Sequence, residues 1–127
     1  MKIRIKNNSI RLRLTRSEVD LMLDSGVVTS KTTFPSGREF HYTLASNPAS
    51  VNITASYFDN EIRVQLPTEM TLAWTKTEQI AIKSEQVIDD GERLSILIEK
   101  DFACLAPRTN EDEADMYPHP DVDSRST

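Results

Sequence analysis

Residues 1–14, MKIRIKNNSIRLRL, alternate apolar and basic side chains on either side of an Asn-Asn pair. Successive side chains of a β-strand point to opposite faces, so this pattern predicts two strands that each have an apolar and a basic face. Asn7-Asn8 tolerates positive φ and predicts a two-residue hairpin turn. The turn sets the register Lys2–Arg13, Ile3–Leu12, Arg4–Arg11, Ile5–Ile10 and Lys6–Ser9, in which the apolar pairs fall on one face and the basic residues on the other.

The predicted hairpin gathers five cations on one small face: Lys2, Arg4, Lys6, Arg11 and Arg13. Like charges placed directly opposite each other are mildly destabilising. Such a face needs an anion nearby, which could be a carboxylate of the same chain, a phosphate or solvent. We therefore predict that Lys2, Arg4, Arg11 and Arg13 bind an anionic partner, although an ordinary solvated face is the alternative.

Local signals place the remaining elements. Thr15 and Glu18 form a capping box that begins a helix, and Gly26 ends it. Pro67 opens a second short helix through about Trp74, whose neighbours place its ring in the core. Period-two patterns predict the other strands, in order, over 27–34, 38–45, 51–57, 62–66, 79–87 and 93–100.

The two halves of the chain resemble each other. Residues 10–15, IRLRLT, match residues 62–67, IRVQLP, at the same offset that relates Asn7-Asn8 to Asp59-Asn60. We predict one α+β domain over 1–105 with an internal repeat of 2–46 and 51–100, followed by an acidic tail over 106–127. Two ββαββ units with two short helices would pair into a mainly antiparallel, barrel-like, pseudo-two-fold structure that hides sheet edges.

Composition limits the classes of function. The 127 residues include one cysteine and three glycines, so neither an internal disulfide nor a phosphate-cradling glycine loop is expected. Cys104 has no local base, which disfavours nucleophilic catalysis. No stretch reads as a secretory signal or a membrane span. We expect a cytoplasmic protein that has no cofactor and does not bind membranes. Whether it is an enzyme stays open, and the composition favours a protein that is not.

Charge is unevenly distributed along the chain. The first 16 residues carry six bases and no acid, whereas residues 101–127 carry seven acids and two bases, and the net charge is −5. The acidic tail could fold back on the basic hairpin face as a strap. The function that this favours is a non-enzymatic binding or interaction module.

Two other classes of function stay open. Cys104, Glu111, Asp115 and His119 could hold a divalent metal, which would make the protein metal-binding or a metal-dependent enzyme, although their spacing matches no standard zinc pattern. Nucleic-acid binding is the second alternative, although the aromatic residues typical of a single-strand-binding surface are absent from the basic hairpin.

Two resemblances follow from these segments. Residues 1–19 with 98–105, IEKDFACL, and the acids of 111–115 before Tyr117-Pro118 resemble a small bacterial family of uncharacterised proteins. That resemblance implies a bacterial protein and brings no known activity. Residues 62–69, IRVQLPTE, with 79–82 are similar to the strand–Pro–x–Glu–helix–strand unit of swapped-hairpin transcription regulators, but residues 75–78 lack that family's Gly-containing turn. This second resemblance implies DNA binding as an alternative.

Overall fold

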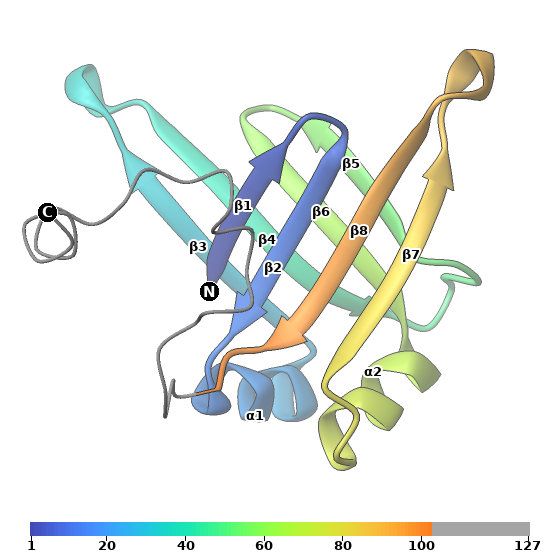
Figure 1. Cartoon of the computed structure of the whole chain (residues 1–127). Helices are drawn as coiled ribbons and strands as arrows, with labels where there is room; N and C mark the ends of the chain where they lie inside the picture. The colour runs from blue at the N-terminus through green and yellow to red at the C-terminus, as the bar shows by residue number, and fades with distance from the viewer. Residues whose placement is uncertain (103–127) are drawn as a thin grey trace, which may run out of the picture.

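The computed structural model describes residues 1–102, in which two helices and eight strands build a mixed α+β fold (Figure 1). The predicted N-terminal hairpin is confirmed with all five residue pairs in the expected register. Asn7 and the Asp59-Asn60 pair adopt positive φ in the two corresponding turns. The elements are β1 Lys2–Lys6, β2 Ser9–Leu14, α1 Arg16–Ser25, β3 Val27–Thr33, β4 Glu39–Asn47, β5 Thr54–Phe58, β6 Glu61–Pro67, α2 Thr68–Lys76, β7 Ala81–Val87 and β8 Arg93–Lys100.

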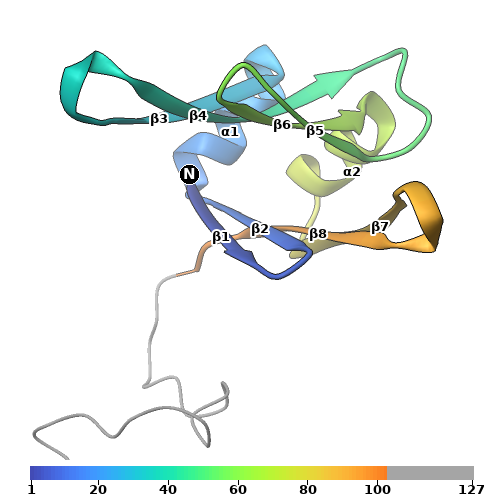
Figure 2. The same cartoon turned by 90° about the horizontal axis from the view of Figure 1, so that it is seen from above.

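The strands form two four-stranded sheets. Sheet A has the order β1-β2-β8-β7, and sheet B has the order β3-β4-β6-β5. Each half of the chain contributes one antiparallel hairpin to each sheet, and the hairpins join through parallel pairing of β2 with β8 and of β4 with β6. Figure 2 shows the sheets as two facing layers.

The expected barrel is not closed. Within residues 1–102 no strand pairs across from sheet A to sheet B, so β1, β7, β3 and β5 remain edge strands. Both helices lie at one end of the two layers, where they cover the core (Figure 1). The parallel pairs lie at the centre of each sheet, and within residues 1–102 the outer strands of one sheet find no partner in the other, so the barrel stays open.

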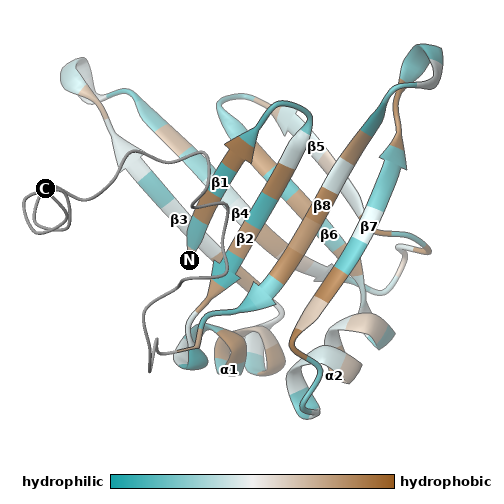
Figure 3. Cartoon of the chain, in the orientation of Figure 1, coloured by the Kyte–Doolittle hydropathy of each residue, from teal (hydrophilic) through white to brown (hydrophobic). Residues whose placement is uncertain are grey.

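The core lies between the sheets and under the helices. Apolar and polar residues alternate along β2 as the sequence predicts (Figure 3). Leu12 and Leu14 are fully buried. Trp74 of α2 is 0% exposed, as expected for a core residue. The polar faces of the same strands therefore point away from the core, and the basic face of the first hairpin becomes the outer surface of sheet A.

Helix α1 begins and ends where the sequence signals predict. Thr15 and Glu18 form the reciprocal capping box, and Gly26 follows the last turn in the left-handed region at φ 77°. The Gly26 N–H donates to the carbonyl of Met22 at 3.0 Å, and the Gly26 carbonyl accepts from Ser46 of β4. Gly26 therefore ends the helix and ties it to sheet B.

We expect Gly26→Ala to lower the free energy of unfolding by about 1 kcal/mol, because an L side chain is strained at this φ. Space is not the reason, since an added Cβ would lie 3.6 Å from the Ser46 Cβ, an ordinary contact. Urea denaturation measures the loss. Gly26→Asn is the matched control, because Asn tolerates the left-handed region, and equal losses for both variants would contradict this explanation.

Candidate anion-binding face

The outer surface of sheet A carries a row of residues, one from each strand, that crosses the sheet at mid-height. Its members are Arg4, Arg11, Leu97 and Lys83, which are successive Cα partners across β1, β2, β8 and β7. We call these four residues the central row. Three of them are cations and none is an acid, so the row concentrates positive charge around one apolar side chain.

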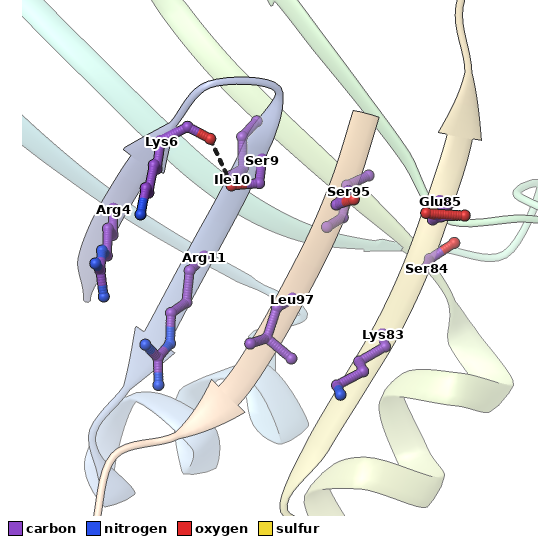
Figure 4. Close-up of a pocket in the computed structure, with 11 residues that line it drawn as sticks. Arg4, Lys6, Ser9, Ile10, Arg11, Lys83, Ser84, Glu85, Ser95 and Leu97 are labelled. Atoms are coloured by element: carbon purple, nitrogen blue, oxygen red, sulfur yellow. Dashed lines mark hydrogen bonds between the residues drawn. The ribbon is translucent and has the colours of Figure 1, made fainter. Parts of the chain in front are cut away.

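An open hollow of about 640 Å³ lies over the central row. Lys6 and Ser9 border it from the first hairpin, and Glu85 and Ser95 border it from the second half of the chain. Figure 4 shows Arg11 and Lys83 on either side of Leu97, with Arg4 and Lys6 projecting from β1. The hollow therefore has an apolar floor and basic residues on both sides.

The neighbouring row neutralises part of this charge. Glu99 of β8 is the Cα partner of Arg13, and its Oε1 accepts hydrogen bonds of 2.6 Å from the Nε atoms of Arg11 and Arg13. Lys2 pairs with Asp101 at 3.0 Å. A carboxylate of the same chain is thus one of the anions that the basic face required.

The Glu99 carboxylate is held in its charged form. Partial burial acts to raise its pKa, but the hydrogen bonds and positive charges of Arg13 and Arg11 outweigh this effect, so the pKa lies below its ordinary value of 4.5. Glu99 therefore stays ionised at neutral pH and orients both guanidinium groups along the sheet.

Carboxylates neutralise only some of the cations on the outer surface of sheet A. Within residues 1–102, Arg4, Lys6 and Lys83 take part in none of the ion pairs, and all three are exposed. Glu85, the other acid beside the hollow, pairs instead with Arg93 at 3.3 Å. The centre of the face is left with more cations than carboxylates.

On the outer surface of sheet B, carboxylates lie beside the cations and neutralise their charge. Thr43 Oγ1 donates to Glu61 at 2.6 Å and shares a hydrogen bond of 3.0 Å with Thr29. Arg63 lies 3.6 Å from the same Glu61 carboxylate, and Lys31 pairs with Glu39. Each cation of this face has a carboxylate beside it, so the excess of positive charge belongs to sheet A alone.

The structure thus brings the four predicted residues to one surface in different surroundings. Arg4 and Arg11 belong to the central row, and Arg13 and Lys2 lie beside it. Arg11 and Arg13 both contact Glu99, and Lys2 contacts Asp101, so Arg4 alone of the four has no ion pair within residues 1–102. Sequence reasoning missed Lys83, Leu97 and Glu99, because they come from strands whose pairing with the first hairpin has no local signal. Ile80 and Ile82 on one face of their strand do indicate that Lys83 points to the other face.

The predicted metal ligands Cys104, Glu111, Asp115 and His119 lie outside the described residues, as does the acidic tail. In the described part of the chain, His, Cys, Asp and Glu side chains form no group of three that could hold a metal ion. Neither helix there has the length and apolar character needed to cross a membrane.

A family model described as a family of unknown function, DUF7009, matches residues 1–121. This match confirms the resemblance to an uncharacterised family, while bacterial origin stays a prediction. No curated protein and no solved structure matches the chain.

Proposed function

Because the chain belongs to DUF7009, a family of unknown function, we propose from its geometry that it is a non-enzymatic binding module for an anionic partner. The observation that carries the proposal is the central row, in which Arg11 and Lys83 flank Leu97 and Arg4 lies beside Arg11. Arg11 is paired with Glu99, whereas Arg4 and Lys83 take part in no ion pair within residues 1–102. Arginine and lysine side chains arranged around a hollow suit a ligand with several separated negative charges.

The apolar floor of the hollow indicates which kind of anionic partner fits there. Leu97 is partly buried between Arg11 and Lys83 and offers contact to an apolar group. A peptide segment that combines carboxylates with an occasional apolar side chain matches both parts of the hollow. A free inorganic anion would use only the cations and leave the Leu97 floor without a contact.

The acidic residues 111–115 of the same chain are the candidate occupant closest in sequence. The chain leaves β8 beside the basic face, where the Asp101 N–H donates to the Leu14 carbonyl at 2.8 Å and the Asp101 carboxylate pairs with Lys2. The ten residues that follow can span about 33 Å, which exceeds the width of a four-stranded sheet. An intramolecular strap is therefore geometrically allowed.

The test measures binding of poly-L-glutamate to the full chain at low ionic strength. We expect the Arg4→Gln/Lys83→Gln double variant to bind about tenfold more weakly, because two exposed cations are lost at no more than about 1 kcal/mol each. Lys76→Gln, at the far end of α2, is the matched control with the same type of substitution. Equal affinities for the double variant and the control would contradict the proposal.

Three added measurements separate the alternatives. Tighter binding of a single-stranded oligonucleotide than of poly-L-glutamate, with affinity that falls steeply with salt, would assign the face to nucleic acid instead. If elemental analysis of untagged protein finds a stoichiometric metal, the protein is a metal-binding protein and the proposal of an anion-binding module is overturned. Proteolysis of the tail that accelerates with added salt would support the intramolecular strap, and indifference to salt would count against it.

We further infer that the two halves arose by duplication and are related by a pseudo-two-fold axis. The order of five elements in each half supports this, and so do the equivalent parallel pairings β2–β8 and β4–β6. Ser36-Gly37 and Asp90-Gly91 share positive φ at equivalent hairpin tips. On this proposal the cationic face is a specialisation of sheet A, since the equivalent face of sheet B is compensated.

A further inference from the structure

The end of the molecule opposite the helices carries an uncharged hollow between the two sheets. Its volume is about 410 Å³, and it is lined by residues from both sheets without any acid or base: Ile5, Asn7, Ile10, Phe40, Ala55, Ser56, Tyr57, Ile62 and Leu94. Ile5 is 55% exposed and Tyr57 is 67% exposed. We call this hollow the mouth. Clustered apolar exposure of this kind marks an interaction site more often than plain surface.

Two hairpins project beyond the mouth, one on each side of it (Figure 1). They are the β3–β4 hairpin, whose tip is residues 34–38, and the β7–β8 hairpin, whose tip is residues 88–92. Both tips are closed by the same hydrogen bond of 2.7 Å, from Phe34 N to Arg38 O and from Ile88 N to Glu92 O. Phe34 and Ile88 are both exposed there, so each tip adds an exposed apolar side chain beyond the mouth.

The two tips carry opposite charge. Residues 34–38 contain Arg38 and no acid, whereas residues 88–92 contain Asp89, Asp90 and Glu92 and no base. Within one molecule the tips lie on opposite sides of the mouth, so they do not pair with each other (Figure 1). A second copy of the chain can pair with both tips. In a two-fold interface, a contact of the basic tip of one copy with the acidic tip of the other occurs twice, once in each direction.

We propose that the protein forms a two-fold dimer in which the mouths face each other. A half-turn about an axis that lies in the plane of the mouth, perpendicular to the line that joins the two tips, brings each basic tip beside the acidic tip of the other copy. The lining of the mouth is uncharged, so it adds no like-charge contact between two copies that each carry a net charge of −5. The central row of sheet A stays outside this interface, so the dimer does not depend on the proposed anion binding.

Sedimentation equilibrium of the full chain tests the dimer at protein concentrations up to about 100 μM. We expect a monomer–dimer equilibrium that weakens with salt. Arg38→Glu should raise the dissociation constant about tenfold, since two symmetry-related contacts change together. Lys76→Glu is the matched control, because it makes the same change in charge at the helix end of the molecule. A monomer at every concentration would overturn the proposal.

A charge exchange makes the assignment of the tips specific. Asp89→Lys/Glu92→Lys should weaken the dimer, and its combination with Arg38→Glu should restore it, because each reversed tip then meets a reversed partner. Tyr57→Ser tests the mouth and should also weaken association, with circular dichroism confirming that the variant is folded. A dimer that is insensitive to Tyr57→Ser, or a combined variant without recovery, would show that the interface lies elsewhere.

Discussion

Replacing Trp74 by alanine should lower the free energy of unfolding by about 4 kcal/mol, because it leaves a large cavity where α2 meets both the core and α1. Trp74 is 0% exposed and lies among the buried residues that join the helices to the sheets. Its indole N–H donates to the carbonyl of Ile80 at 3.1 Å, just before β7 begins. One side chain therefore holds a helix, the core and the entry to sheet A together.

Urea denaturation followed by circular dichroism measures this loss, since the only tryptophan is absent from the variant. Trp74→Phe is the matched variant and should cost much less, because it keeps most of the ring in place. The Ile80 carbonyl also accepts from Lys100 N at 3.0 Å, so it stays hydrogen-bonded in that variant. Leu72→Ala on the same helix, where the side chain is 39% exposed, should cost little. A loss for Trp74→Ala no greater than that for Leu72→Ala would contradict the central role of Trp74.

Replacing Glu99 by glutamine should destabilise the protein by about 2 kcal/mol at pH 7, because two partly buried arginines lose their shared charged acceptor. The arginine contacts keep the pKa of Glu99 below 4.5 in the folded protein. A carboxyl whose pKa is lowered on folding stabilises the folded state fully above its ordinary pKa. That contribution is lost as the pH falls below 4.5 and through the folded-state pKa.

The difference in stability between the wild type and Glu99→Gln should therefore be constant near neutral pH and shrink as the solution is acidified below pH 4.5. Urea midpoints at a series of pH values measure it. Glu85→Gln removes the exposed carboxylate that pairs with Arg93 on the same face, and little change is expected there. A difference for Glu99→Gln that persists unchanged at low pH would contradict the role of the charge. Glu99→Gln should also bind poly-L-glutamate more tightly, since Arg11 and Arg13 are released.

Local patterns were sufficient to predict the order of the helices and strands, although not every boundary. The strand predicted over 51–57 begins at Thr54, and Pro67 ends β6 and precedes α2 instead of opening the helix. Alternation gave the register of the first hairpin, and Thr15, Glu18 and Gly26 gave both ends of α1, because each signal acts within a few residues. The pairing of β2 with β8 has no such signal, since β-strands with apolar inner faces are compatible with many neighbours. The sequence therefore predicted a barrel-like structure, whereas the strands of residues 1–102 form two separate sheets.

The difference between local signals and long-range strand pairing also explains which residues of the candidate site could be predicted. Lys2, Arg4, Arg11 and Arg13 were predictable because they share one hairpin face. Lys83 and Glu99 join that face only through parallel and antiparallel pairings to residues far away in sequence. Reasoning from one hairpin thus overestimated its unpaired charge at Arg11 and Arg13 and missed the basic side chain on the far edge of the sheet.

The parallel pairing of β2 with β8 also has a consequence for biosynthesis. Arg11 and Glu99, which meet in the finished sheet, are 88 residues apart in the chain. At ordinary translation speeds, on the order of ten seconds pass between the appearance of these two residues. Strands β3 to β6 are made in between and need no other part of the chain to complete their sheet. Until Glu99 has been made, Arg11 and Arg13 of the first hairpin lack the carboxylate that they share in the folded protein.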